Sequence, residues 1–431
     1  MKTNQRLLLI LFFVIGCMDL SFGQNIVLKQ SNESGMYKKG EKIQISVFIK
    51  DQKPDSITVK IRKNYSDKTV TQKIAYQGNK VIVLNDSYDE PTSIILEVKT
   101  KTESASIGLV VDPYHFKPGT QRPKDFDSYW ENEKKTLHAL PMEVKSDPVT
   151  MHEEGYQCFN TEINCTGLKP ARGYFAKPVG AKAKSLPIVL YVHAAGVNGN
   201  WCLSQPKKAL QYAKMGKGAL CFDLNAHGML NGQPQSYYDD LNKGELKSYN
   251  SFGIGSRNDY YFRGMYLRLM RTLDFLTSQP EWDGQRILVI GESQGGGQAL
   301  AAAGLDHRVT AVVATVPAMC DWGGTIAGRQ GGWPNPFNST IDREKLLETL
   351  PYFDAAHLLK DSKATLMTEI GFIDVTCPST SIFAAINRSK GKKIVLGVPY
   401  RGHQLDQKSF KETWENTVNK AKTEFVADFL K

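Results

Sequence analysis

From about residue 124 onward, short apolar runs alternate with longer segments in which apolar residues recur every three or four positions. The short runs are typical of buried strands, and the longer pattern is typical of helices that cover a sheet. Strands are expected at 188–193, 218–223, 286–290, 310–316, 365–370 and 393–398. The segment 265–276 places its apolar residues on one face, which predicts a core-packing helix. The alternation predicts an α/β fold with a mostly parallel, doubly wound sheet.

Residues 24–111 have a different pattern, in which apolar and polar residues alternate over short runs separated by turn-forming residues. The runs predict strands at 43–49, 57–61, 81–84 and 94–98. Their spacing predicts a small antiparallel β-sandwich of the immunoglobulin-like type. A spacer or packing role is favoured over carbohydrate binding, because its tyrosines, Tyr37, Tyr65, Tyr76 and Tyr88, form no evident platform.

The boundary between the two patterns is predicted at residues 112–123. Pro113, Pro118, Gly119 and Pro123 fall within this short stretch, which favours a linker. The second domain is therefore expected to comprise residues 124–431.

Residues 1–23 have the order of a secretory signal peptide. Lys2 and Arg6 precede an apolar run too short to span a membrane, and Ser21-Phe22-Gly23 supplies small residues for cleavage after Gly23. The alternative is lipidation of Cys17, since the residues before it resemble a bacterial lipobox. Either route predicts an exported bacterial protein, periplasmic or secreted, with a membrane anchor only if Cys17 is lipidated.

Composition and charge exclude several classes of function. The net charge is +10, but the lysines are scattered and form no arginine-rich patch for nucleic acid. The chain lacks a His-Glu-x-x-His motif and zinc-type cysteine spacing, so no metal or other cofactor is expected. The six cysteines after Cys17 are predicted to be buried thiols. The sequence gives no indication of the oligomeric state.

One motif carries the strongest chemical signal. Gly291-Glu292-Ser293-Gln294-Gly295-Gly296 follows an apolar run and precedes an alanine-rich, helix-forming segment. A glycine-flanked serine between a strand and a helix is the nucleophile elbow of an α/β-hydrolase, in which the tight turn lifts the serine above the sheet edge. Ser293 is therefore the predicted nucleophile of a serine hydrolase.

A serine nucleophile needs a histidine to take its proton and a carboxylate to orient that histidine. In this fold the chain order is serine, acid, histidine, which leaves His307, His357 and His403. His403 is favoured, because it lies in a glycine-containing loop just after a predicted strand, whereas the other two fall in a turn and a helical segment.

The acid is predicted to be Asp374, in the loop that follows the strand 365–370, with Asp321 and Asp354 as alternatives. An oxyanion would be bound by backbone N–H groups, for which Gln294 and Ala195 are the candidates. His193 and His227 are expected to shape loops rather than to act in catalysis.

With these residues placed, the second domain resembles the acetyl xylan esterase and cephalosporin C deacetylase family, carbohydrate esterase family 7. The most specific motifs are Gly-Glu-Ser-Gln-Gly-Gly-Gly at 291–297, Gly-Phe-Ile-Asp-Val-Thr-Cys-Pro-Ser-Thr at 371–380 and Gly402-His403. The resemblance implies a metal-independent esterase that removes small acyl groups, mainly acetyl, from sugar hydroxyls through an acyl-Ser293 intermediate. Acetylated oligo- or polysaccharide, such as acetylated xylan, is the substrate it implies. It does not extend to the N-terminal sandwich.

Three motifs depart from the family pattern. The His-Gly-Tyr loop reads His193-Ala194-Ala195, the Arg-Gly-Gln-Gly run reads Asn-Ala-His-Gly at 225–228, and the His-Glu pair reads His403-Gln404. A backbone donor survives the change to Ala195, but loss of the ring predicts a wider pocket. Trp333 is the candidate for stacking on sugar, since it lies in a predicted loop near the site.

Two other functions are weighed against this prediction. A prolyl-type peptidase of the same fold is disfavoured because the N-terminal domain is too short for a propeller, while another ester or lactone hydrolase of this fold is kept as an alternative. A non-catalytic glycan-binding surface protein is disfavoured by the complete set of Ser293, Asp374 and His403.

Overall fold

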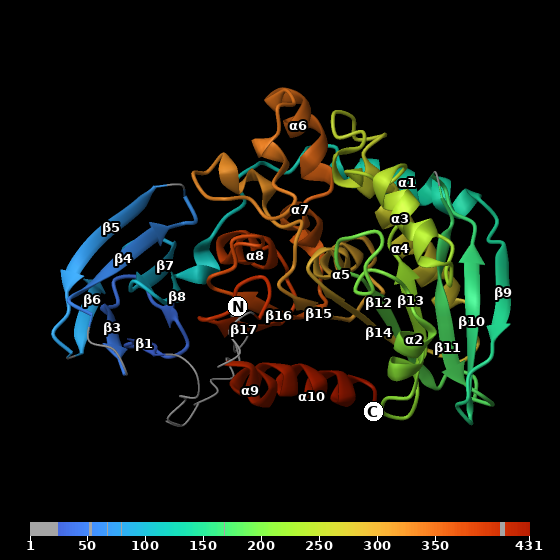
Figure 1. Ribbon diagram of the computed structural model, residues 1–431. Helices are drawn as coiled ribbons and strands as arrows, with labels where there is room; N and C mark the ends of the chain where they lie inside the picture. Colours follow the sequence, from blue (N-terminus) through green and yellow to red (C-terminus); the bar gives the residue numbers. More distant parts are fainter. Residues whose placement is uncertain (1–24, 51–53, 67, 79, 168, 406–409) are drawn as a thin grey trace, which may run out of the picture.

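The computed structural model describes residues 25–50, 54–66, 68–78, 80–167, 169–405 and 410–431. The predicted signal segment 1–23, with Cys17 and Gly23, lies outside these residues. A large sheet crosses the centre of the molecule and a smaller β-structure lies beside it (Figure 1).

The central sheet has nine strands in the order β17-β16-β15-β14-β12-β13-β11-β10-β9. Strands β12 to β17 pair in parallel. Their bounds are β12 Leu186–Val192, β13 Leu220–Asn225, β14 Trp282–Glu292, β15 Ala311–Thr315, β16 Thr365–Gly371 and β17 Lys393–Val398. Each predicted strand of this domain is thus present, although most of the observed strand ends differ by a few residues from the predicted ones. The mostly parallel α/β sheet is therefore confirmed.

Both faces of this sheet are covered, which explains why its strands are apolar without alternation. Ile188 and Leu190 of β12 belong to one core cluster, and Val189 between them belongs to another. The first cluster packs against helices α1 Phe126–Ala139, α4 Tyr261–Thr277, α5 Gln294–Leu305, α7 Ala355–Leu358 and α8 Ser379–Ile386. The second packs against α2 Pro206–Ala213 and α10 Lys420–Phe429. In Figure 1, α10 and the short α9 Lys411–Trp414 lie below the sheet.

The sheet continues at one end with antiparallel strands. β9 Val144–Val149, β10 Tyr156–Ile163 and β11 Ala171–Pro178 precede the parallel strands in the chain, and β11 pairs with β13. Helices α3 Gln235–Lys243 and α6 Arg343–Thr349 lie in long connections above the parallel strands.

The predicted N-terminal β-sandwich is confirmed as two facing sheets. One has the order β1-β3-β6 and the other β2-β8-β7-β4-β5. Their bounds are β1 Ile26–Gln30, β2 Met36–Tyr37, β3 Ile43–Ile49, β4 Ser56–Lys63, β5 Thr69–Ala75, β6 Val81–Asp86, β7 Thr92–Lys99 and β8 Ser104–Val111. Ile45 and Val47 of one sheet share a core cluster with Val59 and Leu96 of the other. Alternate residues of β3 therefore supply the apolar interior that the sequence pattern predicts.

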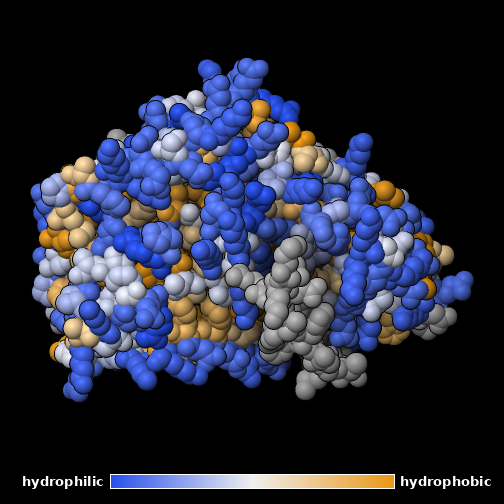
Figure 2. Space-filling view, turned by 180° about the vertical axis from the view of Figure 1, so that it is seen from behind, coloured by the Kyte–Doolittle hydropathy of each residue, from blue (hydrophilic) through white to orange (hydrophobic). Residues whose placement is uncertain are grey.

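The surface shown in Figure 2 is mostly polar, and the described cysteines are free thiols, as the sequence predicts. Hydrophilic side chains cover most of the rear face, with apolar residues visible in smaller areas between them (Figure 2). Each described cysteine is free, and all except the half-buried Cys165 are buried. Among the described residues, no helix has the length and apolar character needed to cross a membrane.

Candidate active site

Ser293 lies at the turn between β14 and α5, as the elbow motif predicts. Its backbone has φ 54° and ψ −119°, a region that non-glycine residues rarely occupy. The conformation is held because the Ser293 N–H donates to Thr315 O at 2.9 Å and its carbonyl accepts from Ala318 N at 2.9 Å. The side chain is thereby presented at the carboxyl edge of the parallel strands.

The structure brings Ser293, His403 and Asp374 together. The Oγ of Ser293 is 2.9 Å from Nε2 of His403, and Nδ1 of His403 is 2.9 Å from Oδ2 of Asp374. Because Asp374 accepts a hydrogen bond from Nδ1–H, Nε2 is left without a proton and can accept the hydroxyl proton of Ser293. Asp374 is fully buried and the His403 side chain is 22% exposed, so the carboxylate is screened from water while the imidazole reaches the surface.

The other carboxylate oxygen of Asp374 fixes its own loop. Oδ1 accepts hydrogen bonds from the N–H groups of Thr376 and Cys377, both at 2.8 Å. The carboxylate is therefore oriented on one side by backbone donors and on the other by His403.

The predicted oxyanion donors lie on neighbouring elements. Val192 of β12 pairs with Gly291 of β14, so the loop that leaves β12 runs beside the elbow. Gln294 is the first residue of α5, and its N–H has no carbonyl partner within the helix. The N–H of Ala195 makes no hydrogen bond to any part of the chain that the structure describes. Neither N–H has a hydrogen-bond partner among the described residues, so both stay candidates for binding an oxyanion.

His193 and His227 hold the Ala195 loop from both sides. His193 donates from Nδ1 to Trp201 O at 3.2 Å, and its Nε2 contacts the buried carboxylate of Asp223. His227 donates from Nε2 to Gly196 O at 2.9 Å and accepts from Tyr261 Oη at 2.8 Å. Burial lowers the pKa of His227 to about 3, so this ring is neutral and keeps one tautomer. Both histidines shape the loop, as expected.

The alternative acids and bases are engaged elsewhere. His357 is buried in α7 with its Nε2 2.9 Å from Thr120 Oγ1, and His307 lies in the turn between α5 and β15. Asp354 accepts from the N–H groups of Asp321 and Trp322, and burial together with neighbouring Asp321 raises the pKa of Asp354 to about 7. These two aspartates organise a buried loop, and neither contacts His403.

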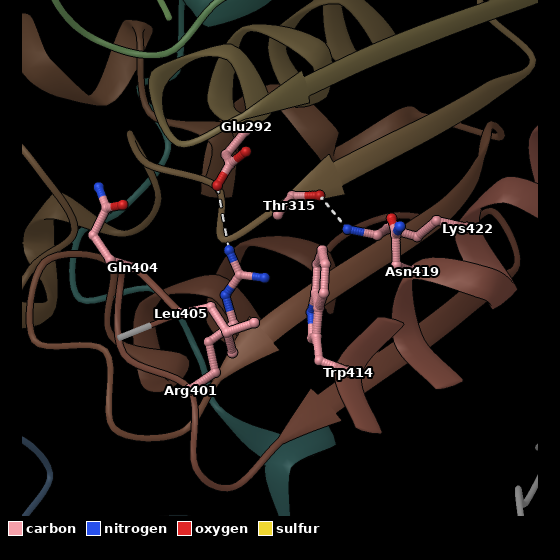
Figure 3. Close-up of a pocket in the computed structure, with 8 residues that line it drawn as sticks. All are labelled: Glu292, Thr315, Arg401, Gln404, Leu405, Trp414, Asn419 and Lys422. Carbon is pink, nitrogen blue, oxygen red and sulfur yellow. Dashed lines mark hydrogen bonds and ion pairs between the residues drawn. The ribbon is translucent and has the colours of Figure 1, made fainter. Parts of the chain in front are cut away.

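A cavity of about 310 Å³ is lined by Glu292 and Gln404, the sequence neighbours of Ser293 and His403, among other residues shown in Figure 3. Glu292, which precedes Ser293, and Arg401, which lies two residues before His403, approach each other across it at 3.2 Å. Arg401 also pairs with the fully buried Glu369, whose carboxylate accepts from Trp414 Nε1 at 2.6 Å. Lys422 also lines the cavity and pairs with Glu369, so Glu292 and Glu369 together balance Arg401 and Lys422. These ion pairs hold the loop that carries His403, and they make the cavity a poor site for an anion.

One trio of side chains near the site has the spacing of a metal centre. Ligand atoms of Asp374, Cys377 and His403 all lie within 4.8 Å of one another. Burial raises the pKa of Cys377 well above its usual value, which favours the neutral thiol over the thiolate that binds metal. His403 also already uses Nδ1 on Asp374, so these residues suit an acid–base pair better than a metal.

Trp333 lies beside the Asp374 loop, and its role in substrate binding stays a prediction. Its N–H donates to Thr376 O at 3.0 Å, and its half-buried ring packs against the main core.

Trp201, which lies on the Ala195 loop, is not among the substrate-binding candidates that the sequence predicts. Its side chain is 66% exposed, although its indole N–H donates to Ala195 O at 2.9 Å. The glycine-containing run Gly-Val-Asn-Gly-Asn-Trp at 196–201, shortly after a predicted strand, could have indicated that Trp201 lies in a loop near the site.

Comparison with known proteins supplies independent findings. The family model described as acetyl xylan esterase (AXE1) matches residues 110–413. The curated acetyl esterase Axe7A of Xylanibacter ruminicola is 26% identical over 416 residues, with 93% of each chain covered.

Two solved structures are also similar to this chain. An acetyl xylan esterase from a Paenibacillus species is 26% identical with a TM-score of 0.60, covering 74% of this chain and 98% of that one. Acetyl xylan esterase 1 from a Thermoanaerobacterium species is 22% identical with a TM-score of 0.57, covering 74% of this chain and 97% of that one. These similarities confirm the α/β-hydrolase fold predicted from the elbow.

Proposed function

Because the chain belongs to the acetyl xylan esterase (AXE1) family and is therefore a carbohydrate esterase, we propose that it deacetylates sugar hydroxyls through an acyl intermediate on Ser293. The observation that carries this proposal is the hydrogen-bond chain from Asp374 through His403 to Ser293. Such a chain is the arrangement that turns a weakly nucleophilic alcohol into an effective one.

In the first half of the reaction, Ser293 Oγ attacks the acetyl carbonyl carbon while its proton passes to His403 Nε2. The imidazolium that forms is stabilised by the buried carboxylate of Asp374. As the tetrahedral intermediate collapses, the bond from carbon to the sugar oxygen breaks and His403 returns the proton to that oxygen. The deacetylated sugar leaves and an acetyl ester of Ser293 remains.

The negative charge of the tetrahedral intermediate needs donors that are already in place. The N–H groups of Gln294 and Ala195 lie at the start of α5 and in the loop after β12, and in the proposed reaction they donate hydrogen bonds to the oxyanion. Removal of one such donor typically costs roughly 100- to 1,000-fold in kcat.

In the second half, a water molecule takes the place of the sugar. His403 removes a proton from the water as it attacks the acetyl carbon, and Ser293 leaves with that proton as acetate is released. No redox change occurs, and the net reaction consumes one water for each ester bond.

The proposed substrates are acetylated xylan and related oligosaccharides. This choice follows the family and the names of relatives, which describe an acetyl esterase and acetyl xylan esterases. The replacement at Ala195 suggests a pocket that accepts a bulkier sugar or a longer acyl group than is usual.

Acetate release tests this proposal. Wild-type protein is expected to release acetate from acetylated xylan, and Ser293→Ala is expected to lower the turnover by roughly 1,000-fold or more with the fold intact. Ser185→Ala is the matched control, because Ser185 is exposed before the amino end of β12 and should leave turnover unchanged. Full activity in Ser293→Ala, or hydrolysis of peptides with no acetate release, would contradict the proposal.

A further inference from the structure

The N-terminal β-sandwich contacts the larger domain at the loop that carries Asp374. Tyr65 follows β4 and is only 2% exposed, because its ring is buried between the two parts of the chain. Its hydroxyl donates to Phe372 O at 3.0 Å and accepts from the N–H of Ser379 at 3.1 Å. The hydroxyl of Ser379 lies 2.9 Å away and donates the remaining hydrogen bond. The hydrogen-bonding capacity of this phenol is thus fully used by the other domain.

These partners flank the acid loop. Phe372 lies two residues before Asp374, and Ser379 is the first residue of α8. A single hydroxyl of the sandwich therefore bridges both ends of the segment whose middle orients His403.

The sandwich also reaches the loop that carries His403. The N–H of Gly108 in β8 donates to Pro399 O at 2.7 Å, four residues before His403 in the chain. A Cβ at Gly108 would lie 2.3 Å from Phe372 O, so only glycine permits this approach. One face of the sandwich thus contacts the bases of both loops.

The backbone at Tyr65 is held in an uncommon conformation. Asn64 and Tyr65 have φ of 53° and 55°, and a positive φ is unfavourable for a bulky aromatic residue. The turn is fixed because Asn64 N donates to Ser93 O at 2.8 Å and Asn64 Oδ1 accepts from Ser93 N at 2.9 Å. Strain of this kind persists where the surrounding structure imposes it, and here it directs Tyr65 into the other domain.

We propose that the sandwich contributes to catalysis through Tyr65, a positioning residue that holds the Asp374 loop in register with His403. The hydrogen bonds of the Tyr65 hydroxyl to Phe372 and Ser379 are called the clamp below. This inference rests on the proposed serine mechanism. Small displacements of a catalytic group are costly, since an error of about 1 Å can lower the rate by roughly 100-fold. The clamp therefore acts on turnover more than on substrate affinity.

The test is Tyr65→Phe in the full-length protein, which keeps the ring and removes only the hydroxyl. Burial raises the pKa of Tyr65 to about 12, so the hydroxyl is protonated throughout the assay range. We expect kcat for an acetylated xylo-oligosaccharide to fall by roughly 10-fold or more while KM stays within about twofold. Ser379→Ala removes one of the three bonds and should give a smaller loss of the same kind.

Tyr76→Phe is the matched control. Tyr76 is buried in the same sandwich, and its hydroxyl accepts from Ile49 N at 2.8 Å without contacting the larger domain. Tyr65→Phe removes three buried hydrogen bonds and Tyr76→Phe removes one. Both substitutions should therefore lower Tm, but only Tyr65→Phe should lower kcat.

A double-mutant cycle separates positioning from general damage. In an Asp374→Ala background, Tyr65→Phe should change the residual kcat by less than about twofold, because there is no carboxylate left to position. An unchanged kcat in Tyr65→Phe, or an equal loss with and without Asp374, would overturn the inference. If Ser293→Ala and Asp374→Ala abolish turnover while Tyr65→Phe is fully active, only the clamp is wrong. If Asp374→Ala is itself fully active, the serine mechanism fails and the clamp fails with it.

Discussion

Trp201 combines exposure with a fixed orientation. Its indole N–H is tied to Ala195 O, and a Cβ at Gly199 would lie 2.4 Å from the ring, so the ring rests directly on the loop backbone. A large apolar ring that stays open to solvent and cannot rotate freely suits the apolar face of a sugar. Since the same loop carries the candidate oxyanion donor, a stacked sugar would lie near the acetyl group under attack.

This placement predicts a substrate-dependent effect of Trp201→Ala. The variant should raise KM for acetylated xylo-oligosaccharides by roughly 10-fold, the equivalent of an aromatic contact of about 1 kcal/mol or more. For methyl acetate, which has no sugar ring, kcat/KM should change by less than about twofold. Trp201→Phe keeps a ring and serves as the control in the same steady-state assays. An equal loss on both esters would show that Trp201 supports the loop and does not bind sugar.

The roles of some single residues can be predicted from the sequence, and the roles of others cannot. Ser293 and His403 could be predicted because the fold dictates their chain order and the loops that carry them. Trp201 could not, because exposure depends on tertiary packing, and Trp333 occupies an equally polar, glycine-rich segment of the sequence. In the structure Trp333 packs against the core, whereas Trp201 remains exposed.

At the scale of elements, the elbow depends on close packing of α5 against β12. A Cβ at Gly295 would lie 2.3 Å from Val192 O, which is backbone and cannot move aside cheaply. Helix α5 can approach the sheet this closely only with glycine there, and that approach sets the height of Ser293 above the strands.

Gly295→Ala should therefore damage both stability and turnover. Overpacking of this kind costs roughly 1–3 kcal/mol, and the displaced helix should lower kcat by roughly 10-fold or more. Gly264→Ala in α4 is the control, because a Cβ there would meet only Arg268 Nη1 at an ordinary 3.5 Å. In the control, better helix propensity should leave Tm unchanged or raise it. Calorimetry and acetate release would check both; equal behaviour of the two variants would contradict this role for Gly295.

Two of the strands that the sequence pattern did not predict share one explanation. The strands β5 and β9 are almost wholly exposed, so they carry no alternation of apolar and polar residues. Strands that contribute to a core, such as β3 and β17, were predicted within a residue of their observed bounds. Periodicity therefore left these exposed strands unpredicted, and it also missed the mostly buried strands β8 and β11.

At the scale of the whole molecule, the most consequential feature is the contact between the two domains. The sequence favours a spacer or packing role for the sandwich, because its tyrosines form no evident platform for sugar. The hydrogen bond between Tyr65 and Phe372 joins residues 307 positions apart, so no local pattern reveals it. In the structure, the sandwich contacts the loops of Asp374 and His403. This contact between the two domains predicts that a change in the sandwich alters turnover at the active site in the larger domain.

Covalent labelling with a fluorophosphonate, followed by intact-protein mass spectrometry, tests the central claim most directly. Such a probe reacts with a serine only where a base and an oxyanion site activate it. We expect one adduct per chain, located by peptide mapping at Ser293, absent from Ser293→Ala and formed in step with the loss of acetate release. A folded wild-type protein that releases acetate without acquiring this adduct, or acquires it at another residue as activity disappears, would contradict the assignment of Ser293 as the nucleophile.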